Sequence, residues 1–217
     1  MNLVSLPNNL GMLKALCYLK MKDSKITGIP KTYSEIERKS NEIGFTMPSD
    51  IYVGTLLKTL VSSKPKGHFL ELGTGIGLSL SWMVDGMDAE SKITSIDNDP
   101  KLVAIAKSYF EQDKRVKIIG MDGTEWIKNY SGKAFDLIFA DAWPGKYSEI
   151  EETLNLIKPG GIYIIDDMSV QPNWPDGHQE IVDQLIGYLE NRKDFNLTKM
   201  NWSTGIIIAT KKMLTTG

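Results

Sequence analysis

Residues 68–77 read H-F-L-E-L-G-T-G-I-G, and this stretch decides the fold. Its first half is a short, mainly apolar run, which predicts a buried strand. Three glycines follow on alternate positions: Gly73, Gly75 and Gly77. The run Leu78–Val84 contains no helix breaker and predicts a helix. The chain is therefore expected to pass from a strand through a glycine turn into a helix, where a ligand can approach the backbone closely.

An acidic residue follows this turn at the end of the next expected strand. Ser91–Asp97 predicts that strand, and a carboxylate at this place can accept hydrogen bonds from both hydroxyls of a ribose. Nicotinamide enzymes space their glycines G-x-G-x-x-G around a pyrophosphate, whereas this chain reads E-x-G-x-G-x-G with Glu71 before the turn. The pattern favours a nucleoside cofactor with a cationic centre and an amino group.

The glycine stretch resembles the first motif of the class I S-adenosylmethionine-dependent methyltransferases, and Asp97 resembles their ribose-binding acid. Asp122-Gly123 is similar to the adenine-binding position of that family, although Asp122 is an equally good N-cap for a helix. The resemblance implies that S-adenosylmethionine is bound by Glu71, Gly73, Thr74, Gly75, Gly77, Asp97, Asn98, Asp122, Gly123 and Asp141.

Length and composition are those of one globular domain with an N-terminal extension. The 217 residues are 41% hydrophobic and carry a formal net charge of -2, which gives no overall attraction to nucleic acid. Cys17 is the only cysteine, no leader with a cleavage site opens the chain, and no apolar run approaches a membrane span. We expect a cytoplasmic protein without a membrane partner.

The extension, residues 1–45, is expected to be helical and to act as a lid or a dimer contact. One amphipathic helix is marked by Leu10, Leu13, Leu16, Cys17 and Leu19, and a second by Tyr33–Ile43. The basic residues here are interpreted as solvated helix faces, with RNA contact as the alternative: Lys14, Lys20, Lys22, Lys25, Lys31, Arg38 and Lys39. The methyltransferase domain is expected over 46–217, where Ser49 or Asp50 can cap a helix through Leu60.

From residue 66 onward, predicted strands and helices alternate. Besides those named above, strands are expected at 115–119, 135–141, 162–166, 195–200 and 205–210, and helices at 100–112, from 123, at 147–157 and at 178–191. Lys158-Pro159-Gly160-Gly161 is expected to be a turn before the fifth strand. The order predicts a doubly wound, Rossmann-like α/β sheet of seven strands. The family resemblance implies that the last strand is inserted antiparallel.

Carboxylates lie at the end of every one of the first five expected strands, on the edge of the sheet where ligands bind. Asp141, Asp166 and Asp167 follow two of these strands and can supply hard oxygen ligands for Mg²⁺ or another divalent cation. Such a cation would hold the two oxygens of a substrate and lower the pKa of its hydroxyl.

The same region resembles the catechol O-methyltransferase-like branch, whose fourth strand ends D-A-D-K-x-x-Y and whose fifth reads G-G-x-x-x-x-D-N. The first pattern is matched by Asp141, Ala142 and Tyr147, and the second by Gly160, Gly161 and Asp166. Trp143-Pro144 replaces the family's acid and lysine, Asp167 replaces its asparagine, and Lys146 comes two residues after the expected lysine.

Asp141, Lys146 and His178 are the candidate catalytic residues. Lys146 can act as a base or orient the attacking oxygen, or it can simply be a solvated loop lysine; His178 can act as a base or cap a helix. Trp143, Met168 and Trp174 are candidates for a substrate wall that suits an apolar or aromatic acceptor. Alternatively, the two tryptophans pack their loop onto the sheet.

These observations favour an S-adenosylmethionine-dependent methyltransferase that methylates an oxygen of a small hydroxylated substrate, for which an aromatic ring is one option. RNA methylation stays open because of the lysine-rich extension. A non-catalytic cofactor-binding module also stays open, because Trp143-Pro144 replaces residues that the family uses. Aminopropyl transfer has no support beyond the acidity of the site. A homodimer is compatible with the extension.

Overall fold

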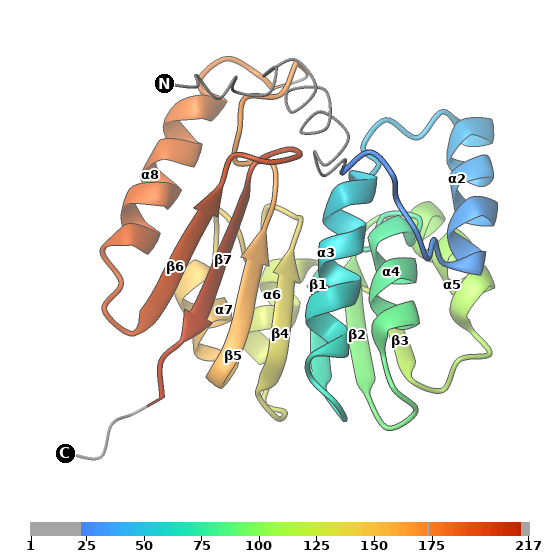
Figure 1. Ribbon diagram of the computed structural model, residues 1–217, viewed down its shortest axis with the longest axis horizontal. Coiled ribbons are helices and arrows are strands. Elements are labelled where there is room, and N and C mark those ends of the chain that lie inside the picture. The colour runs from blue at the N-terminus through green and yellow to red at the C-terminus, as the bar shows by residue number, and fades with distance from the viewer. Residues whose placement is uncertain (1–22, 173, 214–217) are drawn as a thin grey trace, which may run out of the picture.

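The computed structural model describes residues 23–172 and 174–213 as a twisted sheet with helices on both faces (Figure 1). The strands are β1 (His68–Leu72), β2 (Lys92–Asp97), β3 (Val116–Gly120), β4 (Phe135–Ala140), β5 (Ile157–Ile165), β6 (Phe195–Met200) and β7 (Ile206–Lys211). The helices are α2 (Lys31–Ile43), α3 (Ile51–Ser62), α4 (Leu78–Gly86), α5 (Pro100–Phe110), α6 (Gly123–Asn129), α7 (Ile150–Asn155) and α8 (His178–Glu190).

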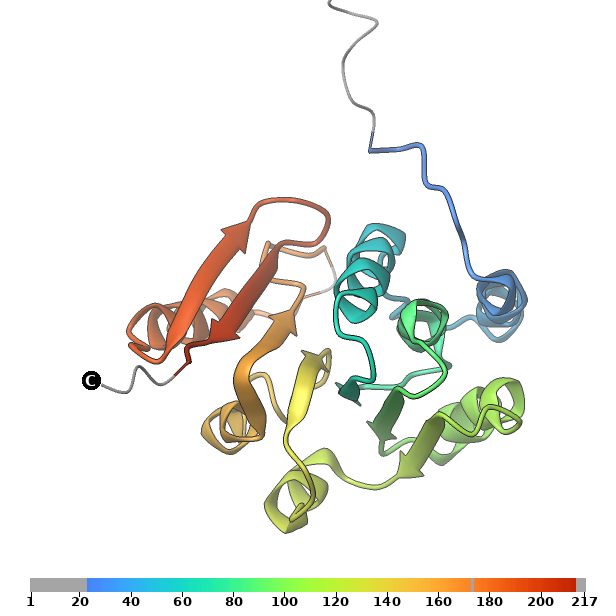
Figure 2. The same ribbon diagram turned by 60° about the horizontal axis from the view of Figure 1, so that its bottom comes forward.

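The seven strands follow the order β3-β2-β1-β4-β5-β7-β6. The pairs within β3-β2-β1-β4-β5 are parallel, whereas β7 is antiparallel to both β5 and β6. Figure 2 shows β7 lying between β5 and β6. The predicted doubly wound sheet with an antiparallel last strand is therefore confirmed.

The register of the central strands aligns their carboxyl ends. Leu72, the last residue of β1, lies opposite Ile96 of β2 and Ala140 of β4. The residues that follow these three positions are Gly73, Asp97 and Asp141. The sheet thus gathers the glycine turn and two carboxylates at one edge.

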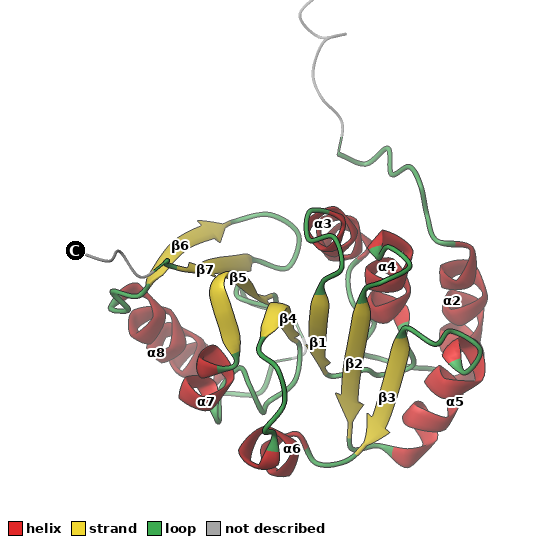
Figure 3. Cartoon of the chain, turned by 90° about the horizontal axis from the view of Figure 1, so that it is seen from below, coloured by secondary structure: helices red, strands yellow, loops and turns green. Residues whose placement is uncertain are grey.

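Two apolar cores cover the two faces of the sheet, and Figure 3 shows α3 and α4 on one face with α6, α7 and α8 on the other. Along β1 the side chains alternate, so Phe69 belongs to the α3–α4 core while Leu70 and Leu72 belong to the opposite core. Glu71 consequently faces α4 from within the sheet, where Ser79 donates a hydrogen bond to it. The alternation therefore places Glu71 on the α4 side of the sheet, beneath the turn.

Two predicted boundaries are wrong. The residues 158–161, expected as a turn, lie inside β5, which begins at Ile157. The ladder with β4 accommodates them by an irregularity between Phe135 and Leu137, where Gly160 has a φ of 76°. Helix α7 begins at Ile150 rather than Tyr147, because the amides of Tyr147 and Ser148 donate to the carbonyl of Trp143 in a tight turn.

The other elements lie close to their predicted places. Asp50 is the N-cap of α3 and accepts a hydrogen bond from the amide of Tyr52 at 2.7 Å. The first predicted helix, marked by Leu10 to Leu19, lies outside the described residues. No helix in the described ranges combines the length and apolar character that crossing a membrane requires.

Helix α2 packs onto the α3–α4 core. Its buried face contains Tyr33, Ile36 and Ser40, and the ring of Tyr33 meets Trp82 of α4 edge-on with centroids 5.5 Å apart. On its exposed face, Arg38 and Lys39 both form ion pairs with Glu42. Arg38 and Lys39 therefore have an acidic partner on their own helix. The boundary between extension and domain near residue 45 stays a prediction.

Candidate active site

A cavity of about 610 Å³ opens at the carboxyl ends of the parallel strands. This volume lies within the range of about 300–1,000 Å³ that is usual for small-molecule sites. The cavity brings together twelve residues selected from the sequence: Gly73, Thr74, Gly75, Asp97, Asn98, Asp141, Trp143, Lys146, Asp166, Asp167, Trp174 and His178. Most of the predicted site is therefore one continuous surface.

The glycine turn lies against the strand ends with no room for side chains. A Cβ on Gly73 would come within 2.6 Å of the carbonyl oxygen of Asp141, and Gly75 has a φ of 51°. The amides of Gly73 and Thr74 both donate to the carbonyl of Ile96. Only glycine at position 73 allows the turn to pack directly on the end of β4.

Asp97 is held in place by backbone donors. Its Oδ2 accepts a hydrogen bond from the amide of Gly75 at 2.7 Å, and its Oδ1 accepts one from the amide of Asp99 at 2.9 Å. A carboxylate oxygen has a second lone pair, so both oxygens can still accept from hydroxyls in the cavity. The arrangement suits the recognition of a diol such as a ribose.

Glu71 lies beneath the turn, fully buried, and does not line the cavity. Its two oxygens accept hydrogen bonds from Ser79 at 2.7 Å and from Ser95 at 2.5 Å. Burial raises the pKa of Glu71 to about 7, and the charge of Asp97 raises it further, against the lowering by the two serines. The structure thus places Glu71 as a support under the turn rather than as a cavity-lining residue.

Four other predicted residues also lie outside the cavity lining. Asp122 is the N-cap of α6 and accepts from the amide of Glu125, and a Cβ on Gly123 would meet Pro144 at 2.9 Å. Gly77 starts α4 with a φ of 97°. Met168 lines a separate, smaller cavity beside Ile186 and Met200.

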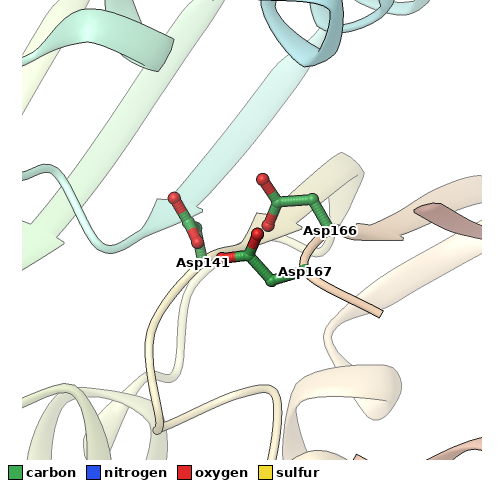
Figure 4. A group of neighbouring side chains, drawn as sticks. All are labelled: Asp141, Asp166 and Asp167. Atoms are coloured by element: carbon green, nitrogen blue, oxygen red, sulfur yellow. The ribbon is translucent and has the colours of Figure 1, made fainter. Parts of the chain in front are cut away.

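Asp141, Asp166 and Asp167 converge at the ends of β4 and β5, with their side chains pointing toward one another (Figure 4). One oxygen from each carboxylate lies within 4.8 Å of the others. Asp167 has a φ of 50°, a conformation that aspartate and asparagine tolerate better than most residues, so its replacement of the family's asparagine keeps the backbone shape.

This carboxylate group fits a hard divalent cation. Asp166 is 2% exposed, and its Oδ1 has no hydrogen-bond partner among the described residues. Burial, followed by the charge of Asp141, raises the pKa of Asp166 well above its usual range. Burial also raises the pKa of Asp141 to about 6, against the lowering by Lys146. Gathered carboxylates of this kind favour either protonation or a bound cation.

Lys146 is buried beside these carboxylates, with only 4% of its surface exposed. Burial acts to lower the pKa of its ammonium, but the charges of Asp166 and Asp141 outweigh this and raise the pKa. The sequence alternative of a solvated loop lysine is therefore wrong, because the loop turns inward at Gly145. There φ is 88°, and a Cβ would come within 2.2 Å of Leu72 Cδ1.

Aromatic rings form the outer wall of the cavity. The ring centroid of His178 lies 4.6 Å from that of Trp174 and 5.3 Å from that of Tyr147, and Trp143 packs 4.9 Å from Tyr147. Trp143 remains 53% exposed at the mouth. The wall combines flat apolar surfaces with the polar edges of His178 and Tyr147.

The sequence did not predict that the segment before α3 belongs to the site. Residues 45–50 line the cavity, Phe45 lies over Gly75, and the hydroxyl of Ser49 donates to Asp141 Oδ2 at 3.3 Å. The sequence singled out only Ser49 and Asp50 here, as helix caps, since threonine, methionine and proline at 46–48 carry no ligand signature. Gln171 and Thr204 also line the cavity and had no signal of their own.

Comparisons with known proteins agree with this geometry. The model of the O-methyltransferase family matches residues 34–190. A curated relative from Mycobacterium avium (strain 104), named as an O-methyltransferase, is 30% identical over 118 residues, which are 52% of this chain and 53% of that protein. The chain thus matches about half the length of the curated relatives.

Solved structures show the same fold. The O-methyltransferase from Bacillus cereus in complex with SAH has a TM-score of 0.71 at 22% identity, covering 92% of this chain and 96% of its own. The SAH-bound Podospora anserina methyltransferase PaMTH1 has a TM-score of 0.75 at 21% identity, covering 98% and 100%. With the family model matching most of its length, this chain belongs to the O-methyltransferase family.

Proposed function

We propose that this protein transfers the methyl group of S-adenosylmethionine to a hydroxyl oxygen of a small, aromatic acceptor. The observation that carries the proposal is the single cavity in which the glycine turn and Asp97 lie next to three convergent carboxylates and an aromatic wall. One half of this cavity suits a nucleoside, and the other suits a hydroxylated ring. Solved relatives in complex with SAH and with SAM support the same donor.

The donor half is built for an adenosyl group with a positive centre. Asp97 offers free lone pairs to the ribose, and the amides and glycine surfaces at 73–75 let the donor lie against the backbone. S-adenosylmethionine supplies a methyl group on a positively charged sulfur. The carboxylate of Asp141 makes the junction of the two halves electronegative, which suits that charge.

The acceptor half is where Asp141, Asp166 and Asp167 would hold Mg²⁺ or a similar cation, which would lower the pKa of an acceptor hydroxyl. Lys146, kept as an ammonium by the neighbouring carboxylates, is proposed to orient the acceptor oxygen and not to remove its proton. Trp143 and Trp174 hold the acceptor ring. The protein then contributes mainly by placing the acceptor oxygen in line with the methyl group.

Calorimetric titration tests this proposal. S-adenosylmethionine is titrated into chelator-treated protein, and catechol is then titrated into the donor-loaded protein with and without Mg²⁺. We expect S-adenosylmethionine to bind to the chelator-treated protein, and catechol to bind only when Mg²⁺ is present. Absence of donor binding would contradict the methyltransferase function, and salt-sensitive retention of RNA in place of catechol would favour the RNA alternative.

A further inference from the structure

Tyr147 and His178 form a hydrogen-bonded pair on the acceptor side of the cavity. The Oη of Tyr147 lies 3.2 Å from Nε2 of His178, and the two rings meet edge-on at 82° with centroids 5.3 Å apart. Both residues line the cavity and both are partly exposed. An acceptor can therefore reach one end of the pair, while water can reach the other.

The position of Tyr147 is fixed by the turn that carries it. Its amide donates to the carbonyl of Trp143 at 2.9 Å, and the amide of Gly145 donates to the carbonyl of Ser148 at 2.7 Å. The buried hydroxyl of Tyr163 donates to the carbonyl of Gly145 at 2.6 Å, which ties the turn to β5. These hydrogen bonds hold the backbone of the turn, so Tyr147 begins from a fixed position beside the cavity.

The position of His178 is fixed by the start of α8 and by neighbouring aromatic rings. It is the first residue of α8, entered through Gly177 with a φ of 82°, and its amide donates to the carbonyl of Pro175 at 3.2 Å. Its ring packs against Trp174 on one side and Tyr147 on the other. A histidine needed only to start the helix would not require a ring enclosed by two aromatic side chains.

The surroundings of Tyr147 oppose ionisation of its phenol. Burial raises the pKa of Tyr147, and Asp167 and Asp166 raise it further, while Lys146, whose Nζ is 5.4 Å from the ring centroid, lowers it. The tyrosine therefore keeps its proton at rest. Glu180 lies in the first turn of the helix that His178 begins.

We propose that Tyr147 and His178 are a proton relay that takes the proton from the acceptor hydroxyl. The inference rests on the proposed methyl transfer and adds the route of its proton. As the acceptor oxygen bonds to the methyl carbon, the carbon–sulfur bond breaks and its electron pair stays on sulfur. The acceptor proton moves to Oη of Tyr147 while the original phenolic proton moves to Nε2 of His178. The imidazolium then releases its proton to water.

The direction of the hydrogen bond is the first test, and it needs no acceptor. The chain has two histidines, His68 and His178, so the ring nitrogens of ¹⁵N-histidine protein can be assigned with the His178→Gln variant. At mildly alkaline pH, where a free histidine is neutral, we expect Nδ1 of His178 to carry the proton and Nε2 to be unprotonated. Tyr147→Phe should shift the Nε2 resonance. A proton on Nε2 in the native protein would overturn the relay.

Kinetics with catechol as the acceptor give the second test. Tyr147→Phe and His178→Gln should each lower kcat about 100-fold without changing the affinity for S-adenosylmethionine, as removal of a general base does. The double variant should be no slower than either single one, because the two groups act as a unit.

Tyr188→Phe is the matched control, because it removes a phenolic hydroxyl on the far end of α8 and outside the cavity. It should retain the native kcat. A loss of kcat in Tyr147→Phe without one in His178→Gln would overturn the relay. If the native protein binds the donor but does not methylate catechol, the acceptor class proposed above fails, and the nitrogen resonances decide the relay alone.

Discussion

Two aspartates at the ends of β2 and β4, on either side of β1, have separable roles in the proposed reaction. Asp97 is held by the amides of the glycine turn and faces the donor half, whereas Asp141 lies with Asp166 and Asp167 in the acceptor half. We predict that Asp97→Ala weakens donor binding by about 2 kcal/mol, as expected for lost hydrogen bonds to a charged group, while Asp141→Asn weakens it less and abolishes turnover. Calorimetry and a methyl-transfer assay measure both effects. Equal loss of donor affinity in the two variants would contradict the division.

Glu71 makes the stability of the protein depend on pH. Its carboxyl has a pKa of about 7 when folded and an ordinary value of 4.5, so the folded state binds more protons between these values. Stability is therefore full below about pH 4.5 and falls as the pH rises through 7, by up to about 3 kcal/mol.

Glu71→Gln should remove most of this fall, which denaturant unfolding at several pH values measures. Glu35→Gln, on the exposed face of α2, is the control that should retain it. An unchanged pH dependence in Glu71→Gln would show that the buried carboxyl is not its source.

For single residues, the sequence predicted the site best where a residue type rarely occurs in that pattern for a purely structural reason. Glycines on alternate positions and acids at strand ends predicted six residues of the cavity lining: Gly73, Gly75, Asp97, Asp141, Asp166 and Asp167. The orientation of Glu71 follows from the alternation of β1, but only once the neighbours on each face are known. Tyr147 was matched to a family motif without a role, since its hydrogen bond to His178 joins residues 31 positions apart.

The turn at 143–148 shows how one element determines the chemistry of the site. In it, Pro144 and Gly145 direct Lys146 inward and Tyr147 toward His178. Gly145→Ala would place a Cβ 2.2 Å from Leu72 Cδ1 at a φ of 88°. We predict a loss of about 2 kcal/mol in stability from strain and overpacking, together with loss of turnover.

Gly187→Ala is the matched control on α8, because nothing lies within 4 Å of the added Cβ. It should raise the free energy of unfolding by about 0.5–1 kcal/mol through the higher helix propensity of alanine. Thermal unfolding and the methyl-transfer assay distinguish the two variants. A stable, active Gly145→Ala protein would mean that the turn can rearrange without affecting Lys146 and Tyr147.

The same element explains a boundary that periodicity could not give. Residues 147–157 have a helical pattern, but Tyr147 and Ser148 are used to close the turn, so α7 starts only at Ile150. Likewise, Lys158-Pro159-Gly160-Gly161 has the composition of a turn, yet it forms an irregular part of β5, because Ile157 before it and Ile162 after it both pair with β4. Local sequence predicts such segments poorly when tertiary hydrogen bonds compete with propensity.

At the scale of the whole molecule, helix α2 packs beneath the glycine turn of the donor site. Ile36 is fully buried, and its Cδ1 lies 3.7 Å from the place where a Cβ on Gly77 would be, directly under the glycine turn. Tyr33 packs on Trp82 of α4, the helix that the turn begins. The described part of the extension thus shares a core with the sheet, in addition to any role as a lid or a dimer contact.

Ile36→Ala tests this coupling between the extension and the site. We predict a loss of about 3 kcal/mol in unfolding free energy from the buried cavity it creates, and weaker binding of S-adenosylmethionine because the turn loses its support. Arg38→Ala, two residues along on the exposed face, should change stability by less than about 0.5 kcal/mol. Denaturant unfolding and calorimetry of both variants decide the matter. If Ile36→Ala unfolds earlier but binds the donor with native affinity, α2 stabilises the core without shaping the turn, and its contribution to function must come from another contact.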